Sequence, residues 1–298
     1  MAPFAECPVC GHAAADRLHG YHCCPACKHQ WKPFVPSVEI ENEVLAPRRV
    51  MKRDGLTDAK LRALRRLTTS RKSLLDFGAG SGKYAYFCRK LFKHVEGIEV
   101  TPSCIAFARD TLGIVLRPEF VPGARYDVIT AWHSLEHLPQ ESLRDIVRRI
   151  HDATNEAFIF SVPNSSSWAS RWFGTMYPFH DPESHFQQFS PASLRRLLED
   201  SGWLRITPFH VAIYSVFCYA QGFTNWVTGT HNLLYFRLKR GRTQTPLTPV
   251  GLGLHVMLFL MFLPLACILT AAERFAPERG ACLHMACYKN DPCHIHPT

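Results

Sequence analysis

The sequence SLLDFGAGSGKYAYFCRKL, residues 73–91, decides the fold class of this chain. Its first five residues are typical of a short buried strand, and Gly78, Gly80 and Gly82 follow within a single turn. Residues 83–91 then show the apolar spacing of a helix. Glycines between a strand and a helix let the backbone bend sharply and approach a ligand, while helix N–H groups face that ligand. The stretch therefore predicts a ligand-binding turn in an α/β sheet.

Two carboxylates beside this turn indicate what kind of ligand it holds. Asp76 stands immediately before the glycines, and Glu99 ends the next apolar strand, residues 95–98. A carboxylate at the second position can accept both hydroxyl groups of a ribose. Ordinary strand-to-helix turns also contain glycines, and nicotinamide-binding turns have the same spacing. These two alternatives stay open on the turn and the carboxylates alone.

The following motifs extend the pattern over residues 73–210. This segment alternates short apolar strands with amphipathic helices, as parallel α/β sheets do. In order along the chain it contains LLDFGAGSG, VEGIEV, YDVITAWHSLEHL and HFQQFSPASLRRLLEDSGW. This ordered set resembles the class I S-adenosylmethionine-dependent methyltransferases, in particular those that act on small molecules and glycans. The LEHL stretch is not expected in a nicotinamide enzyme.

The resemblance implies a Rossmann-like, seven-stranded methyltransferase sheet that binds S-adenosylmethionine. It predicts that the cofactor is held by residues from several motifs, namely Asp76, Gly78, Gly80, Gly82, Glu99, Glu119, His133 and Glu136. Glu119 is included because relatives use an acid after the third strand to reach the adenine. It is the only acidic residue between positions 114 and 125.

Methyl transfer requires an aligned acceptor, exclusion of water and, for a hydroxyl or carbon acceptor, a base. By the resemblance, His133 and His137 lie beside the methionine end of the cofactor, and His185 lies in a loop that covers substrate. These three histidines are therefore the candidate catalytic residues, with His185 preferred as the base. A structural role for His137, in which it holds its loop by hydrogen bonds, remains an alternative.

Two CxxC pairs near the start of the chain predict a metal site. They are CPVC at 7–10 and CPAC at 24–27. Paired knuckles of this kind place four thiolates around one tetrahedral ion, most often zinc, and leave no open position on it. We therefore expect a structural zinc ion held by four cysteines, Cys7, Cys10, Cys24 and Cys27. Similar ribbons precede some glycan methyltransferases and some ribosomal RNA methyltransferases, so the ribbon does not decide the substrate.

The segment 250–272 contains no Lys, Arg, Asp or Glu and is long enough to span a bilayer. Four basic residues between 237 and 242 precede it and favour the cytoplasmic side of a membrane. A class I sheet also needs a seventh strand, for which residues 281–289 are the candidate. We therefore expect a bent hairpin or an in-plane helix inserted before that strand. A buried helix pair is the alternative, because Pro264 and two glycines interrupt the apolar run.

The chain thus divides into five predicted segments. They are a zinc ribbon at 1–36, a linker and basic helix at 37–72, the methyltransferase core at 73–210, a hydrophobic helical insertion at 211–280, and a returning strand and tail at 281–298. The start of the sequence lacks the pattern of a secretory signal, which favours cytosolic thiols over disulfides. We expect a cytoplasmic protein at the inner face of the membrane.

Three functions are compatible with the sequence. The first is methyl transfer to a small-molecule, lipid-linked or glycan acceptor at the cytoplasmic face of the membrane. The second is methylation of RNA, motivated by the ribbon and by ten Lys and Arg between positions 48 and 72. A net charge of +9 favours anionic partners in general and does not choose between lipid and nucleic acid. The third is a non-catalytic, nucleotide-binding membrane scaffold, which the intact glycine turn disfavours.

Overall fold

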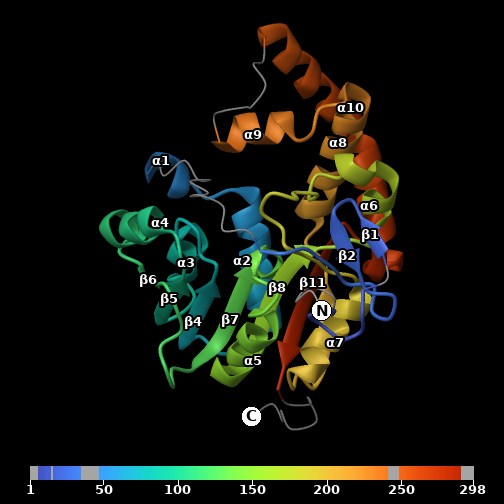
Figure 1. The fold of residues 1–298 in the computed structure, drawn as a ribbon. Helices are drawn as coiled ribbons and strands as arrows, with labels where there is room; N and C mark the ends of the chain where they lie inside the picture. Colours follow the sequence, from blue (N-terminus) through green and yellow to red (C-terminus); the bar gives the residue numbers. More distant parts are fainter. Residues whose placement is uncertain (1–5, 15, 35–46, 241–247, 290–298) are drawn as a thin grey trace.

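The computed structural model describes residues 6–14, 16–34, 47–240 and 248–289. Its centre is a seven-stranded sheet with the strand order β10-β11-β8-β7-β4-β5-β6 (Figure 1). All strands are parallel except β11, which runs antiparallel to both of its neighbours. The strands are β4 (Ser73–Phe77), β5 (His94–Ile98), β6 (Val115–Arg117), β7 (Tyr126–Trp132), β8 (Thr154–Pro163), β10 (Arg205–Phe209) and β11 (Cys282–Tyr288). The predicted Rossmann-like methyltransferase sheet is confirmed, and the returning strand lies between β8 and β10.

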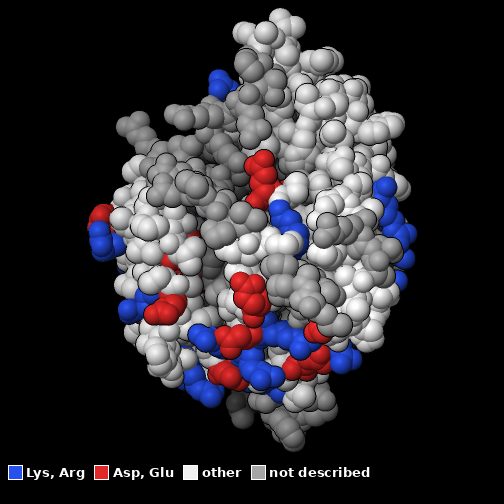
Figure 2. Space-filling model, viewed as in Figure 1, with Lys and Arg blue, Asp and Glu red and all other residues white. Residues whose placement is uncertain are grey.

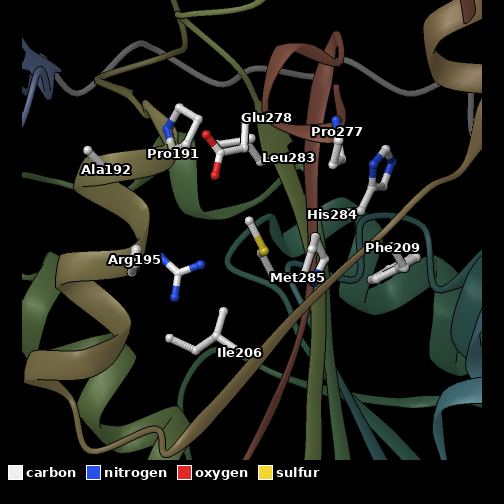
Figure 3. A pocket seen from close by; sticks show the side chains of 11 residues that line it. Pro191, Ala192, Arg195, Ile206, Phe209, Pro277, Glu278, Leu283, His284 and Met285 are labelled. Atoms are coloured by element: carbon white, nitrogen blue, oxygen red, sulfur yellow. The ribbon is translucent and has the colours of Figure 1, made fainter. Parts of the chain in front are cut away.

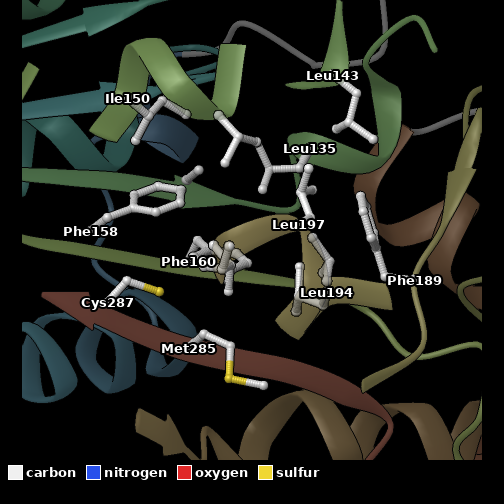
Figure 4. Close-up of a cluster of buried hydrophobic side chains, with 14 of the residues drawn as sticks. Leu135, Leu143, Ile150, Phe158, Phe160, Phe189, Leu194, Leu197, Met285 and Cys287 are labelled. Atoms are coloured by element: carbon white, nitrogen blue, oxygen red, sulfur yellow. The ribbon is translucent and has the colours of Figure 1, made fainter. Parts of the chain in front are cut away.

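Helices cover both faces of this sheet. Apolar side chains of α5 and α7 pack on one face, and those of α2 and α3 pack on the other. Figure 4 shows the layer formed by α5 and α7. Its side chains Leu143, Ile150 and Leu194 belong to one apolar cluster with Phe158 and Phe160 of β8. The helices of the core are α1 (Pro47–Val50), α2 (Gly55–Leu67), α3 (Lys83–Cys88), α4 (Pro102–Phe107), α5 (Leu143–Ala153), α6 (Trp168–Phe173) and α7 (Pro191–Asp200). A π-helical turn (Ala108–Leu112) continues α4, and 3-10 turns lie at Leu135–His137 and Gly174–Met176.

Local sequence explains the main elements. In the strand β8, residues 157–163 are apolar except for Ser161 and all are buried, as expected for a strand covered on both faces. In α5, Leu143, Val147 and Ile150 are buried on one side at helical spacing. The helix α7 begins with a capping box between Ser190 and Ser193.

The N-terminal ribbon is joined to the core by a shared sheet. Strands β1 (Asp16–Leu18), β2 (Tyr21–Cys23) and β3 (Gln30–Trp31) form this sheet with β9 (Gln187–Gln188), which comes from the core. The His29 ring is hydrogen-bonded to the Gln187 side chain at 2.9 Å, and the Tyr21 hydroxyl donates to the His185 carbonyl oxygen at 2.8 Å. The ribbon is therefore joined by hydrogen bonds to the segment that carries His185.

The C-terminal apolar segment forms one long helix. Helix α10 (Pro249–Ala272) is continuous through Pro264 and packs along α8 (Ala212–Thr228). The bent hairpin is therefore wrong, because α10 is one helix that packs on α8 on both sides of Pro264: the Phe262 ring stacks on Phe223 at 5.1 Å, and Ala266 lies in one apolar cluster with Cys218. The in-plane helix stays a prediction. Residues 249–275 are long and apolar enough to cross a membrane, judged by length and composition alone. Only 17% of the residues in a strongly apolar stretch of this helix are buried. Helix α9 (Leu233–Arg240) and the turns Glu273–Phe275 and Pro277–Arg279 complete this region.

The predicted division into five segments remains a prediction. Several parts of it lie outside the described residues: the linker at 37–46, residues 241–242 of the basic stretch, and the whole of 290–298.

Candidate functional site

The glycine turn after β4 has the backbone that the sequence predicts. Gly78, Gly80 and Gly82 have φ values of +71°, +55° and +78°, in the left-handed region that favours glycine. A Cβ atom on Gly78 would lie 2.3 Å from the hydroxyl oxygen of Ser134. Side chains are therefore excluded from this part of the turn, and its backbone can approach a ligand closely.

Glu99 lies directly after β5, and three backbone amides fix its carboxylate. The N–H of Gly80 donates to Oε2 at 2.7 Å, and those of Val100 and Thr101 donate to Oε1 at 2.9 Å each. A carboxylate offers about four acceptor positions, so one remains open on Oε2. In this conformation Glu99 has room for one ribose hydroxyl, and a second hydroxyl would compete with an amide.

Asp76 lies behind the glycine turn. It is 3% exposed, and the Thr130 hydroxyl donates to its Oδ1 at 2.7 Å. Burial raises the pKa of Asp76 to about 6, although the Thr130 hydrogen bond and the charge of Lys60 oppose the rise. The side chain therefore contributes a negative charge beneath the turn at pH 7 and loses it in mildly acidic solution.

Apolar side chains lie at the sheet edge where an adenine contact by Glu119 was expected. Glu119 is exposed on the loop after β6. The next residue, Phe120, stacks on Phe77 with ring centroids 5.8 Å apart, and Val100 beside Glu99 is 74% exposed. Because β5 and β6 end side by side, these apolar groups follow the same sheet edge. Sequence reasoning missed them, since single apolar residues form no motif.

The turn after β7 contacts the glycine turn and carries a histidine–carboxylate pair. The Ser134 hydroxyl donates to the Phe77 carbonyl oxygen at 3.0 Å. Next to it, His133 Nδ1 and Glu136 Oε1 are 3.0 Å apart. Glu136 is fully buried, and its Oε2 has no hydrogen-bond partner among the described residues. Burial acts to raise the pKa of Glu136, but the His133 hydrogen bond and nearby histidines hold it below its ordinary value.

His137 and His185 meet on the other side of Glu136. Their rings are 4.8 Å apart in a T-shaped arrangement. Nδ1 of His137 is 2.8 Å from the Ser184 carbonyl oxygen, and Nδ1 of His185 is 3.0 Å from that of Phe179. A carbonyl oxygen only accepts, so each Nδ1 donates and each Nε2 carries the free lone pair. Burial lowers the pKa of His185 to about 4, so its ring is neutral at pH 7.

The structure thus brings the three predicted histidines together around one carboxylate. It also places neighbours there that no sequence motif indicates. The Tyr214 ring of α8 lies 4.8 Å from the His133 ring, and Cys282 Sγ of β11 lies 3.7 Å from His133 Nε2. Both come from segments far along the chain, and only the fold places them at this site.

A separate cavity of about 290 Å³ lies between α7 and the strands β10 and β11 (Figure 3). Its walls are mostly apolar, and its polar side chains are Arg195, Glu278 and His284. None of the predicted site residues lines it, so this cavity is not the predicted cofactor site.

The four ribbon cysteines converge on one point. Their sulfur atoms lie within 4.8 Å of one another, with Cys7–Cys27 and Cys10–Cys27 separations of 3.6 Å and a Cys10–Cys24 separation of 3.4 Å. Zn–S bonds of about 2.3 Å in a tetrahedron give sulfur–sulfur edges of about 3.8 Å. The described geometry therefore fits one tetrahedral thiolate site.

Comparison with known proteins gives one family and several similar folds. The family described as "Methyltransferase domain" matches residues 49–206, which include the glycine turn, Glu99, His133, Glu136 and His185. No curated protein matches the chain in sequence.

Similar solved structures include a SAM-dependent methyltransferase from Archaeoglobus fulgidus, with 15% identity, a TM-score of 0.47 and coverage of 78% of this chain and 93% of that one. Magnesium protoporphyrin IX methyltransferase from Synechocystis has 15% identity, a TM-score of 0.41 and coverage of 55% and 86%. A Haemonchus contortus phosphoethanolamine N-methyltransferase has 12% identity, a TM-score of 0.49 and coverage of 78% and 53%.

The family match covers more than half of the chain, and its residues form the sheet and the glycine turn described above. The chain therefore belongs to the methyltransferase-domain family and is a class I S-adenosylmethionine-dependent methyltransferase.

Proposed function

We propose that this methyltransferase modifies a small-molecule, lipid-linked or glycan acceptor while bound to the cytoplasmic face of a membrane. The exposed apolar surface of α10 is the observation that carries this proposal. Many of its large apolar side chains are open to solvent; they include Val250, Leu254, Met257, Leu260, Met261 and Ile268. A helix that is apolar on all sides and packs against the protein on only one side is more stable in contact with lipid than with water.

The same helix is connected to the catalytic end of the sheet. Helix α10 packs along α8, where the Phe217 and Phe259 rings lie 6.1 Å apart. Near its first turn α8 carries Tyr214, whose ring contacts His133. An acceptor held at the membrane surface by its lipid part is therefore near the histidine cluster.

The distribution of charge supports the same orientation. In Figure 2, Lys, Arg, Asp and Glu form a mixed band around the lower end of this face. The described surface at the upper end, over α8 and α10, is nearly without charged side chains in that view. Such a partition suits a protein that faces lipid with one end and water with the other.

For the chemistry, bound S-adenosylmethionine supplies a methyl group on a cationic sulfonium. The glycine turn and Glu99 bind its nucleoside part in this proposal, and the Asp76 charge stabilises the cationic part. His133 is the favoured base, because Glu136 orients its ring as a base–carboxylate pair requires. His185, preferred on the sequence, lacks a carboxylate hydrogen bond and instead donates to the Phe179 carbonyl oxygen.

We also propose that the ribbon cysteines hold one structural zinc ion, because four converging sulfurs leave no open coordination position. The ion would fix the ribbon sheet and, through β9, the segment that leads from His185 to α7.

The acceptor proposal is tested by labelling. Full-length protein is incubated with methyl-labelled S-adenosylmethionine and, separately, a lipid extract, a soluble metabolite fraction or total RNA from the source cells. Label in a lipid-linked, glycan or small-molecule product is the expected result. Label in RNA would instead support the second function, and a Gly80→Arg variant serves as the inactive control in each fraction.

A further inference from the structure

The Glu136 carboxylate, which carries one buried oxygen without a hydrogen-bond partner in the described structure, stands beside nitrogen atoms of two histidines. One carboxylate oxygen of Glu136 and one ring nitrogen each from His137 and His185 all lie within 4.8 Å of one another. Glu136 is fully buried, and its Oε2 makes no hydrogen bond within the described part of the chain. An unpaired oxygen of this kind costs about 1–3 kcal/mol, and more if charged. A binding partner absent from the polypeptide itself would remove that cost.

The two histidines are prepared as metal ligands. Each donates its Nδ1–H to a backbone carbonyl oxygen, His137 to Ser184 and His185 to Phe179. Such hydrogen bonds fix the tautomer and the ring orientation of metal-ligating histidines. They leave both Nε2 atoms available to a ligand, since the hydrogen bonds of the two rings to described residues use Nδ1.

The carboxylate is fixed in the same way. Glu136 Oε1 is held by His133 Nδ1 at 3.0 Å. The backbone around it is also anchored, because the Phe186 N–H donates to the Glu136 carbonyl oxygen at 2.8 Å. One oxygen is therefore used for orientation and the other is open, which is the arrangement of a ligating carboxylate with its supporting hydrogen bond.

We propose that Glu136, His137 and His185 bind a divalent transition-metal ion of the zinc, iron or manganese class. Two imidazoles and one carboxylate match the nitrogen and oxygen donors that these ions take. Three protein ligands leave coordination positions open, in contrast to the four cysteines of the ribbon.

The coordination positions that the three protein ligands leave open determine which class of acceptor the ion can bind. Glu136 is two residues from Ser134, whose hydroxyl contacts the glycine turn, so the ion lies beside the cofactor site. An acceptor that presents a hydroxyl or carboxylate oxygen suits these positions, and the ion would lower the pKa of a hydroxyl bound there. This inference goes beyond the proposed function, because metal binding is measured without any acceptor and without a membrane.

The test is a cobalt titration of the full-length protein loaded with a single equivalent of zinc per chain, which the four thiolates take in preference to the three-ligand site. Zinc first fills the cysteine site, and any cobalt that displaces it is recognised by thiolate charge-transfer absorption. We expect one additional Co²⁺ per chain, with the spectrum of nitrogen and oxygen ligands. His137→Asn and His185→Asn should each weaken this binding at least about 100-fold, since each removes one of three ligands.

The asparagine variants are chosen to separate ligation from folding. An asparagine amide lies near the position of Nδ1 and can keep the donor to Ser184 or Phe179, while Nε2 is lost. Calorimetry with S-adenosylmethionine reports whether each variant retains its fold. If an asparagine variant does not fold, Glu136→Gln replaces it, because its amide oxygen can still accept from His133.

A matched control is His210→Asn. His210 is hydrogen-bonded to Glu273 at 3.0 Å and lies outside the three-ligand cluster, so this variant should bind Co²⁺ as the wild type does. The proposal is overturned if the wild-type protein takes up no cobalt beyond the cysteine site. It is equally overturned if folded ligand variants bind cobalt with unchanged affinity.

Discussion

At the residue scale, we expect Asp76 to make cofactor binding dependent on pH. Its pKa is raised to about 6 by burial, so the folded protein binds this proton more tightly than the unfolded chain does. Its contribution to stability therefore decreases as the pH rises from about 4 to 6, and the ionised form predominates above that range. The ionised carboxylate attracts a cationic cofactor, and the protonated form does not.

We predict that the affinity for S-adenosylmethionine falls as the pH is lowered through 6, by about tenfold at pH 5 relative to pH 7. Asp76→Asn should bind the cofactor weakly and with little pH dependence over this range. Calorimetry at fixed ionic strength measures both. A wild-type affinity that is constant between pH 5 and 7 would contradict the assigned role of Asp76.

Gly78 offers a second residue-scale prediction with an internal control. Gly78 and Gly123 have nearly equal φ values, +71° and +73°, but only at Gly78 would a Cβ meet a neighbour, the Ser134 side chain. Gly123→Ala should cost about 1 kcal/mol from backbone strain alone. Gly78→Ala should cost at least about 2 kcal/mol and abolish cofactor binding, because strain and overlap add. Urea unfolding and calorimetry on both variants measure the difference, and equal effects would show that the turn tolerates a side chain.

At the element scale, α10 is apolar both on the side that packs against α8 and on the side that is exposed. A helix at the surface of a soluble protein usually has polar residues on its exposed side. One side holds Ala266 and Phe259 against α8, while the rest of the helix exposes apolar side chains. The helix is capped at its start by the Thr248 hydroxyl, which accepts from the Gly251 N–H. Its order thus comes from capping and from α8, and its exposed face is left for another partner.

We predict that Met257→Glu combined with Met261→Glu prevents binding to phospholipid vesicles without unfolding the protein. Both side chains are more than half exposed and lie one helical turn apart, so the change adds charge to the face proposed to meet lipid. Leu204→Glu with Val115→Glu is the control, since these residues are exposed elsewhere on the molecule. Vesicle co-sedimentation is the measurement, and equal binding by all three proteins would exclude α10 as the membrane contact.

At the scale of the whole molecule, the ribbon and the catalytic segment form one hydrogen-bonded unit. Strand β3 pairs with β9, the Ser190 hydroxyl donates to the Cys27 carbonyl oxygen, and Arg144 donates to the carbonyl oxygens of Pro8 and Val9. Loss of zinc from the ribbon should therefore change the dynamics of residues well beyond residue 36.

We predict that chelating the ribbon zinc, or replacing Cys7 and Cys10 with serine, increases amide hydrogen exchange at residues 185–190 as well as in the ribbon. Exchange in β4 and β5 should change little, because these two strands belong to the seven-stranded sheet and are not hydrogen-bonded to the ribbon sheet. Hydrogen exchange with mass spectrometry compares these peptides in the zinc-loaded and zinc-free protein. Increased exchange confined to the ribbon would show that the ribbon is an independent module.

The sequence by itself determined the elements and the cofactor turn. Strand and helix periodicities are local, so β4 and β5 lie close to their predicted positions. The positive φ values at Gly78, Gly80 and Gly82 follow from a local need for glycine. The resemblance to the methyltransferase family then predicted a seven-stranded sheet with a returning strand, which is β11 (Cys282–Tyr288).

Only the tertiary structure decided how the catalytic end is built. His185 joins Glu136 and His137, and Tyr214 and Cys282 join His133, across separations of about 50 to 150 residues that no local pattern encodes. The single helix α10 likewise depends on α8, because packing overrides the helix-breaking tendency of Pro264. Local propensity acts within a few residues, whereas burial and hydrogen bonding between distant segments select which side chains share a site.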